Sequence, residues 1–280
     1  MLKHKVLLFL FQIKLLLCNC HTEIRESGFT KGKRHTKTQL VGHLPSEVNE
    51  SSGLVKLRNQ SALLTLNDGG GKAEVYQVDS TGQLLQVVPI PRTHNTDWED
   101  LTQDTQDNWY IGDIGNNQQN RKDLCIYKVS VSSSSVDTIK FSYQNQRFLA
   151  TEPPIYDSEA LLWHRDSLYI FSKNRGDNRM VHLYAMPAQS GTYSLMSQDS
   201  IFLKTQVTGA VLRPDGGQMA ILTYGKVFLF DVSDGRISFK KPTKCIKFAH
   251  RQTEAITYWD AHNLLITNEQ GQVFRLQLKN

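Results

Sequence analysis

The stretch Ser158-Glu159-Ala160-Leu161 opens a short apolar strand, and Thr253-Glu254-Ala255-Ile256 opens another in the same way. Three similar openings complete the set: Ser51-Ser52-Gly53-Leu54, Trp98-Glu99-Asp100-Leu101 and Thr208-Gly209-Ala210-Val211. The copies recur with a period of roughly 45–60 residues, which is the range typical of β-propeller blades. This repeat decides the predicted architecture.

Each opening is followed, about ten residues later, by a second apolar strand that ends in a polar or glycine-rich turn, and then by a third strand. Ser167-Leu168-Tyr169-Ile170-Phe171 is an example of the second strand and Val227-Phe228-Leu229-Phe230 of the third. Nearly continuous apolar strands are typical of sheets that are covered on both faces, as stacked blades are. The sequence therefore predicts an all-β fold, a β-propeller of five blades. Six blades is the alternative if the N-terminal segment adds more strands.

The predicted propeller needs one more strand to close. The last repeat ends at Asn280 after only three strands, whereas residues 37–44 have strand character of their own. We expect this N-terminal strand to complete the last blade, because such pairing removes two open sheet edges at once. Residues 37–280 are thus predicted to form a single propeller domain.

The composition is that of an ordinary globular protein. Of the 280 residues, 39% are hydrophobic and 21% are charged, and the formal net charge is +5. Much of the positive charge lies in the N-terminal stretch, so the body is close to neutral. This balance argues against a nucleic-acid partner.

Residues 1–20 resemble an export segment. Lys3 and Lys5 precede an apolar run over residues 6–17 that is too short and too interrupted to span a bilayer comfortably. Cys18 or Cys20 is the expected lipidation site if the protein is a lipoprotein, and residues 21–36 are expected to form a flexible tether. The predicted location is the cell envelope, as a periplasmic protein or an outer-membrane lipoprotein, or outside the cell. The only membrane contact expected is through the lipid anchor.

The two remaining cysteines, Cys125 and Cys245, lie in strand-like segments far apart in the sequence. We expect them to be small buried hydrophobic residues and not a disulfide framework.

The candidate site follows from the propeller geometry, since the first strand of each blade lines the central channel. Aligning the repeats places these residues at one equivalent position: Ser52, Glu99, Glu159, Gly209 and Glu254. The ends of the second strands add further polar side chains near the same channel mouth. The predicted ligand-binding set on this channel face is Glu99, Glu159, Glu254, Asp68, Asp113, Lys173, Arg175 and Glu269. Glu50 and Asp97, just before two of the first strands, are additional acidic candidates.

Carboxylates this close together repel unless a cation, a basic neighbour or a shared proton lies between them. One interpretation is a Ca²⁺ site with Glu99, Asp113, Glu159 and Glu254 as ligands, helped by the glycine-containing turn at residues 112–117. A second is structural: each glutamate accepts hydrogen bonds from the adjacent blade or pairs with Lys173 or Arg175. A third is direct catalysis, for which paired carboxylates of the glycosidase type are one form.

Several segments carry a resemblance to known proteins. Asp97-Trp98-Glu99-Asp100-Leu101 and Tyr110-Ile111-Gly112-Asp113-Ile114-Gly115-Asn116-Asn117, with Ile126-Tyr127-Lys128-Val129, resemble exported β-propeller proteins of bacteria, often of the Bacteroidetes type. The openings at residues 157–161 and 253–256 are similar to those of esterase-like, phytase-related propellers. The resemblance implies a propeller fold and export, and more distantly a calcium-assisted phosphoester hydrolysis, for which this chain has few acidic and basic residues.

Two functions of different classes therefore stay open. The leading hypothesis is a monomeric, non-catalytic binding module that recognises an envelope protein, a glycan or a small ligand through its channel face. The alternative is a calcium-dependent hydrolase of phosphoesters or esters. The sequence contains no G-x-S-x-G nucleophile motif and no HExxH zinc motif, and whether the protein is an enzyme is left undecided.

Overall fold

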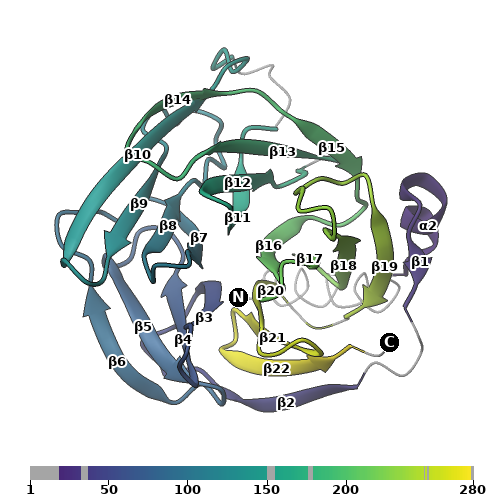
Figure 1. Ribbon diagram of the computed structural model, residues 1–280, viewed down its shortest axis with the longest axis horizontal. Helices are drawn as coiled ribbons and strands as arrows, with labels where there is room; N and C mark the ends of the chain where they lie inside the picture. Colours follow the sequence, from purple (N-terminus) through teal and green to yellow (C-terminus); the bar gives the residue numbers. More distant parts are fainter. Residues whose placement is uncertain are drawn as a thin grey trace, which may run out of the picture.

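The computed structural model describes residues 19–32, 37–149, 155–175, 179–248, 250 and 252–278. Its strands form five sheets that are arranged as blades around a central axis (Figure 1). The chain is therefore a five-bladed β-propeller, as predicted, and not the six-bladed alternative.

The innermost strands are those that begin with the repeated opening: β3 (Ser51–Lys56), β7 (Trp98–Gln103), β11 (Ser158–His164), β16 (Val207–Leu212) and β20 (Thr253–Tyr258). Each contacts the inner strands of both neighbouring blades, so the five together enclose the axis (Figure 1). The openings consequently meet at one end of the channel, and the ends of the inner strands meet at the other.

The middle strands supply most of the buried apolar surface. They are β4 (Ala62–Asn67), β8 (Trp109–Asp113), β12 (Ser167–Ser172), β17 (Gln218–Thr223) and β21 (Asn263–Asn268), followed by β5 (Glu74–Asp79), β9 (Cys125–Ser130), β13 (Met180–Pro187), β18 (Lys226–Asp231) and β22 (Gln272–Gln277). Their side chains form a hydrophobic cluster between every two neighbouring blades. This two-sided burial explains why these strands are nearly continuously apolar.

The outer strands are β6 (Leu84–Pro89), β10 (Ser135–Tyr143), β15 (Asp199–Phe202), β19 (Pro242–Lys247) and β2 (Thr38–His43). The last of these pairs antiparallel with β22, so the N-terminal strand completes the fifth blade as expected. Two blades gain a fifth strand in parallel orientation: β14 (Gly191–Leu195) beside β10, and β1 (Thr30–Lys31) beside β19.

The structure corrects the expected tether at residues 21–36 for its described part. The helix α2 (His21–Ser27) and β1 lie against the fourth blade, and the Phe29 ring centroid is 4.9 Å from that of Phe228. Residues 19–32 are held there because they contribute apolar and paired side chains to the blade edge. Residues 33–36 lie outside the described part.

The structure also corrects two cysteine assignments. Cys20 is buried and forms a disulfide with Cys245 on β19, so its sulfur is not available for a lipid and Cys245 is not a free hydrophobic residue. Cys125 is free and buried, as expected. Cys18, the other lipidation candidate, and the rest of the export segment lie outside the described residues. None of the described helices is long and apolar enough to cross a membrane.

Candidate functional site

Each inner strand carries a β-bulge at the repeated opening. In the pairing of each inner strand with the second strand of its blade, one residue has no partner: Glu99, Glu159, Thr208 or Glu254. In the first blade two residues, Ser52 and Gly53, have none. A bulge takes a residue out of the ladder and re-aims its side chain, and bulges are frequent next to functional sites. The predicted equivalence therefore holds in four blades. In the fourth blade Thr208, not Gly209, occupies the position.

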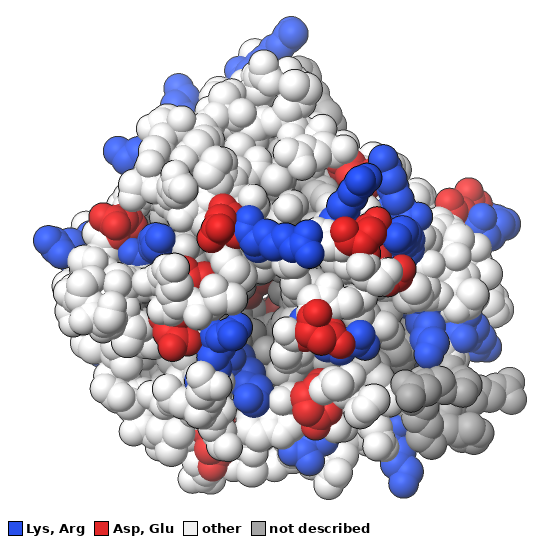
Figure 2. Space-filling model, viewed as in Figure 1, with Lys and Arg blue, Asp and Glu red and all other residues white. Residues whose placement is uncertain are grey.

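A second ring of residues lies beside the bulges. In each blade the first residue of the inner strand pairs with a residue at the end of the second strand. The residue that follows this partner is Asp68, Ile114, Lys173, Tyr224 or Glu269, in blade order. Acidic, basic and phenolic side chains thus come from equivalent positions at the same mouth. The centre of the propeller is hollowed, and acidic atoms are visible inside it (Figure 2).

Two of the three bulge glutamates are engaged by neighbouring side chains. The Nζ atom of Lys173 lies 2.6 Å from Oε2 of Glu159, and Arg175 Nη2 lies 3.1 Å from its Oε1. The hydroxyl of Tyr224 donates a hydrogen bond of 2.7 Å to Glu254 Oε1. The structural interpretation of the glutamates therefore describes Glu159 and Glu254 well.

Two further carboxylates are neutralised by arginines. Asp113 is paired with Arg121 at 2.8 Å and accepts a hydrogen bond of 3.0 Å from the backbone amide of Asp97. Asp157, which is fully buried, is paired with Arg175. Asp113 thus serves to hold the loop that carries Asp97.

Three of the remaining acids form what we call the acidic trio: Asp68, Asp97 and Glu99. Each offers a carboxylate oxygen that lies within 4.8 Å of the others. Among the described residues, no member of the trio has an ion-pair partner. Of the four acids predicted to bind a cation, only Glu99 lies in this group, and the structure places Asp113, Glu159 and Glu254 with partners of their own.

Two glycines make room for the trio. A methyl group at Gly115 would fall on the carboxylate oxygens of Glu99 and Asp97, and one at Gly69 would fall on Asp97. The amide of Gly115 also donates a hydrogen bond of 3.1 Å to the Asp97 carbonyl. Gly115, in the turn at residues 112–117, is therefore required because the two carboxylates approach its backbone too closely for a side chain.

The electrostatics of the mouth favour protonation of the trio. Burial and the carboxylate of Asp68 raise the pKa of Asp97 from 3.8 to about 6. Burial, together with Glu159 and Asp68, holds the pKa of Glu99 well above its ordinary value, and burial also raises the pKa of Asp68. Burial alone would lower the pKa of Lys173, but the carboxylates of Glu159, Glu254 and Glu99 outweigh it and raise this pKa.

We expect the metal-free protein to become more stable when the negative charges of Asp97 and Glu99 are removed by substitution. Between about pH 4 and about pH 6 the native state keeps a proton on Asp97 that the unfolded chain has lost, so the free energy of unfolding falls as the pH rises. The D97N/E99Q variant has no carboxylate at these positions, so its free energy of unfolding should not fall for this reason as the pH rises. Its melting temperature relative to the wild type should therefore increase across this window and stay raised at pH 7, as measured by calorimetry in metal-free buffer. A difference that is independent of pH, or one that shrinks as the pH rises, would contradict the assigned electrostatics.

The trio fits a hard cation. Ca²⁺ takes oxygen ligands at about 2.3–2.6 Å, so oxygens up to about 4.8 Å apart can share one ion. Carboxylates are its preferred charged ligands, and the glycines described above leave the necessary space. Asp68, Asp97 and Glu99 would hold the ion, whose charge would make the ionised form of all three favourable.

The structure brings most of the predicted residues to one mouth, but several of their partners were not predicted. Asp157 was not among the predicted residues, although it precedes Glu159 by two positions as Asp97 precedes Glu99. Tyr224 follows its second strand as Lys173 does, which was the available signal. Arg121 lies in a loop without a repeat equivalent. Glu269, by contrast, was predicted, and it accepts a hydrogen bond from Gln252 at the same mouth.

No protein-family model matches the chain, and no curated protein matches it. Among solved structures it is similar to a gluconolactonase from Xanthomonas campestris, with a TM-score of 0.50 and 12% identity over 92% of this chain and 93% of that one. It is also similar to a luciferin-regenerating enzyme (TM-score 0.48, 14% identity, 81% of this chain and 77% of that one) and to a streptogramin B lyase (0.46, 10%, 87% and 98%). At this identity the likeness to the gluconolactonase concerns the fold, and it agrees with a β-propeller.

Proposed function

We propose that the chain is an exported binding propeller whose acidic channel mouth holds a Ca²⁺ ion and recognises a ligand of the cell envelope. The observation that carries the proposal is the acidic trio, which lies beside paired carboxylates but has no cationic partner of its own among the described residues. A bound cation would offer open coordination positions to oxygen atoms of a glycan, a protein or a small ligand.

Three further observations support this proposal. The side chains of the mouth come mainly from equivalent repeat positions, and the sequence has no nucleophile motif, which favours binding over catalysis. The Cys20–Cys245 disulfide supports export, because disulfides persist mainly in oxidising compartments.

Calcium should stabilise the protein. A ligand that binds only the native state adds about 2.7 kcal/mol at a concentration of a hundred times its Kd. We expect the melting temperature at pH 7 to rise with Ca²⁺ and to return with chelator, and we expect D97N/E99Q to lose this response. The control variant E47Q/D137N, which removes two exposed carboxylates, should keep it. The proposal fails if Ca²⁺ leaves the melting temperature unchanged or shifts D97N/E99Q as much as the wild type.

The ligand itself is sought by binding assays with immobilised envelope glycans and envelope proteins. Binding that requires Ca²⁺ and is lost in D97N/E99Q supports recognition through the mouth. An empty screen, together with robust turnover of a chromogenic ester, rejects the binding module.

One observation favours the second candidate, a calcium-dependent hydrolase of esters or phosphoesters. With no ion bound, Asp97 has a pKa of about 6 and is suited to accept a proton near neutral pH, which is what a general base requires. In this alternative Asp97 would act as the base while Asp68 and Glu99 would hold the ion. Turnover of p-nitrophenyl acetate or phosphate that disappears with chelator and in D97N would support this activity. The absence of turnover by a calcium-loaded protein would remove it.

A further inference from the structure

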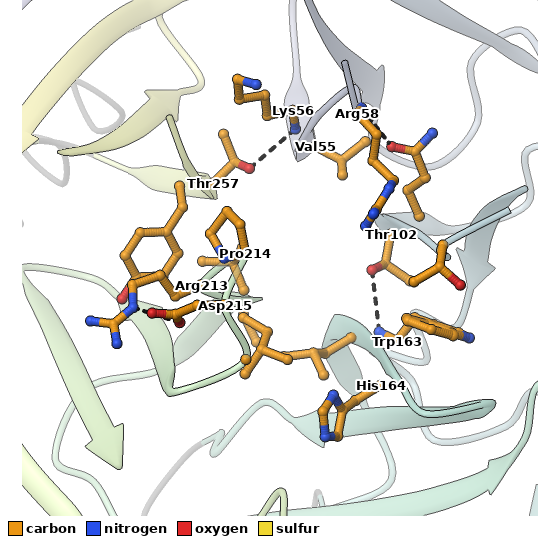
Figure 3. A pocket seen from close by; sticks show the side chains of 18 of the residues that line it. Val55, Lys56, Arg58, Thr102, Trp163, His164, Arg213, Pro214, Asp215 and Thr257 are labelled. Carbon is orange, nitrogen blue, oxygen red and sulfur yellow. Dashed lines mark hydrogen bonds and ion pairs between the residues drawn. The ribbon is translucent and has the colours of Figure 1, made fainter. Parts of the chain in front are cut away.

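A cavity of about 650 Å³ opens at the channel mouth opposite the acidic trio (Figure 3). It is lined by the C-terminal ends of the inner strands, such as residues 54–56 of β3 and 210–212 of β16, and by the hairpins that follow them. The openings with Glu99 and Glu159 lie at the other ends of the same strands. The volume lies in the range of small-molecule sites.

The lining combines an apolar floor with a fixed polar wall. Leu54, Leu101 and Ala210 are buried beneath the cavity. On the wall, Thr257 Oγ1 accepts a hydrogen bond of 3.2 Å from the Lys56 amide, and Thr102 Oγ1 accepts one of 3.2 Å from the Trp163 amide, both drawn in Figure 3. These bonds join neighbouring blades, so the cavity has a rigid wall.

The charged groups around this cavity are mostly basic. Lys56, Arg58, Arg165 and Arg213 line it, against the single acid Asp215. Arg213 is paired with Asp215 at 2.8 Å, and the ammonium of Lys56 lies 5.4 Å from the centroid of the Trp259 ring.

The guanidinium groups of Arg58 and Arg165 have no ion-pair partner among the described residues. Both side chains are exposed. Figure 3 shows Arg58 extending beside Thr102 at the edge of the cavity. The guanidinium of Arg165 lies against the backbone of Gly235, and it donates a long hydrogen bond of 3.4 Å to the Gly235 carbonyl. Two guanidinium groups without an ion pair among the described residues therefore line the cavity. Such groups bind carboxylate, sulfonate or phosphate oxygens in a bidentate manner.

We propose that this basic cavity is a second ligand site, and that it binds a small organic anion whose apolar body rests on the floor while its anionic group contacts Arg58 and Arg165. The ligand class is an aromatic or aliphatic carboxylate, sulfonate or phosphate ester. His164 lines the same cavity, and its Nε2 lies 3.2 Å from the Gly235 carbonyl. The proposal is independent of the calcium site at the opposite mouth.

The test uses two fluorescent probes of nearly the same shape, anilinonaphthalene sulfonate and its uncharged parent N-phenylnaphthylamine. We expect saturable binding of both to the full chain. In R58A/R165A the affinity for the sulfonate should fall about tenfold or more, which is the size expected for lost charge-assisted hydrogen bonds. The affinity for the uncharged probe should stay within about twofold. The control R25A/R92A removes the same charge at exposed positions outside the cavity, and it should bind both probes like the wild type.

Three results would overturn the proposal: no saturable binding of the sulfonate, an equal loss in R25A/R92A, or an equal loss for both probes in R58A/R165A. The D97N/E99Q variant and chelator should leave sulfonate binding unchanged. A loss there would place the probe at the acidic mouth and would also overturn the proposal.

Discussion

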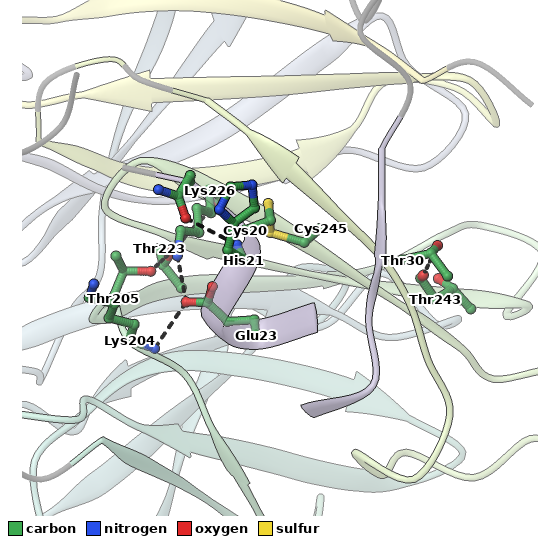
Figure 4. The surroundings of a disulfide bond; sticks show 11 residues. Cys20, His21, Glu23, Thr30, Lys204, Thr205, Thr223, Lys226, Thr243 and Cys245 are labelled. Atoms are coloured by element: carbon green, nitrogen blue, oxygen red, sulfur yellow. Dashed lines mark hydrogen bonds and ion pairs between the residues drawn. A yellow bond between two sulfur atoms is a disulfide. The ribbon is translucent and has the colours of Figure 1, made fainter. Parts of the chain in front are cut away.

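Reduction of the Cys20–Cys245 disulfide should lower the free energy of unfolding by about 3–5 kcal/mol. The bond joins residues 225 positions apart, so it restricts the unfolded chain strongly. It also fixes α2 and β1 against the fourth blade (Figure 4). Denaturant unfolding with and without a phosphine reductant measures the difference.

The C20S/C245S variant is the control for that experiment. It should unfold like the reduced wild type and should not respond to the reductant. A wild-type midpoint that the reductant leaves unchanged would contradict the structural role of the bond.

The second large effect concerns a buried ion pair in the same region. Glu23 of α2 and Lys226 of β18 are fully buried, and the Nζ atom lies 2.5 Å from Oε1 of Glu23 (Figure 4). The same oxygen accepts a hydrogen bond of 3.2 Å from the backbone amide of Lys204. Removing one partner leaves the other charge buried and unpaired, so K226M should cost about 3–5 kcal/mol of unfolding free energy.

The double variant E23L/K226M separates the charge effect from packing. Apolar side chains of similar size often replace a buried ion pair at little cost, so this variant should recover most of the stability lost in K226M. Chemical denaturation of both variants measures this. If K226M leaves the free energy of unfolding unchanged, or if the double variant is as unstable as the single one, the two residues do not act as a pair.

The repeat in the sequence was sufficient to predict the propeller because each inner strand starts with the same bulged opening. Glu99, Glu159 and Glu254 are recognisable as equivalents because the bulge keeps their spacing to the following strand. The fourth copy was misaligned by one residue, since Thr208 and Gly209 are both small and only the strand register distinguishes them. The closing strand β2 was predictable because the last blade lacked a strand.

The partners of the acids were much less predictable. Whether a carboxylate is paired depends on which loop brings a cation to it, as Arg121 is brought to Asp113 and Lys173 to Glu159. The grouping of Asp68 with Asp97 also depends on close approach at Gly69 and Gly115. The Cys20–Cys245 bond was missed because residues 21–36 were expected to be a tether. The packing of residues 21–32 against the fourth blade is a tertiary effect without a sequence period.

The most direct measurement is a crystal structure of the protein grown with Ca²⁺, with anomalous scattering used to locate the ion. We expect an anomalous peak within about 2.3–2.6 Å of carboxylate oxygens of Asp68, Asp97 and Glu99, and no such peak in crystals of D97N/E99Q. A calcium-saturated crystal with these three carboxylates in place and no peak between them would contradict this expectation.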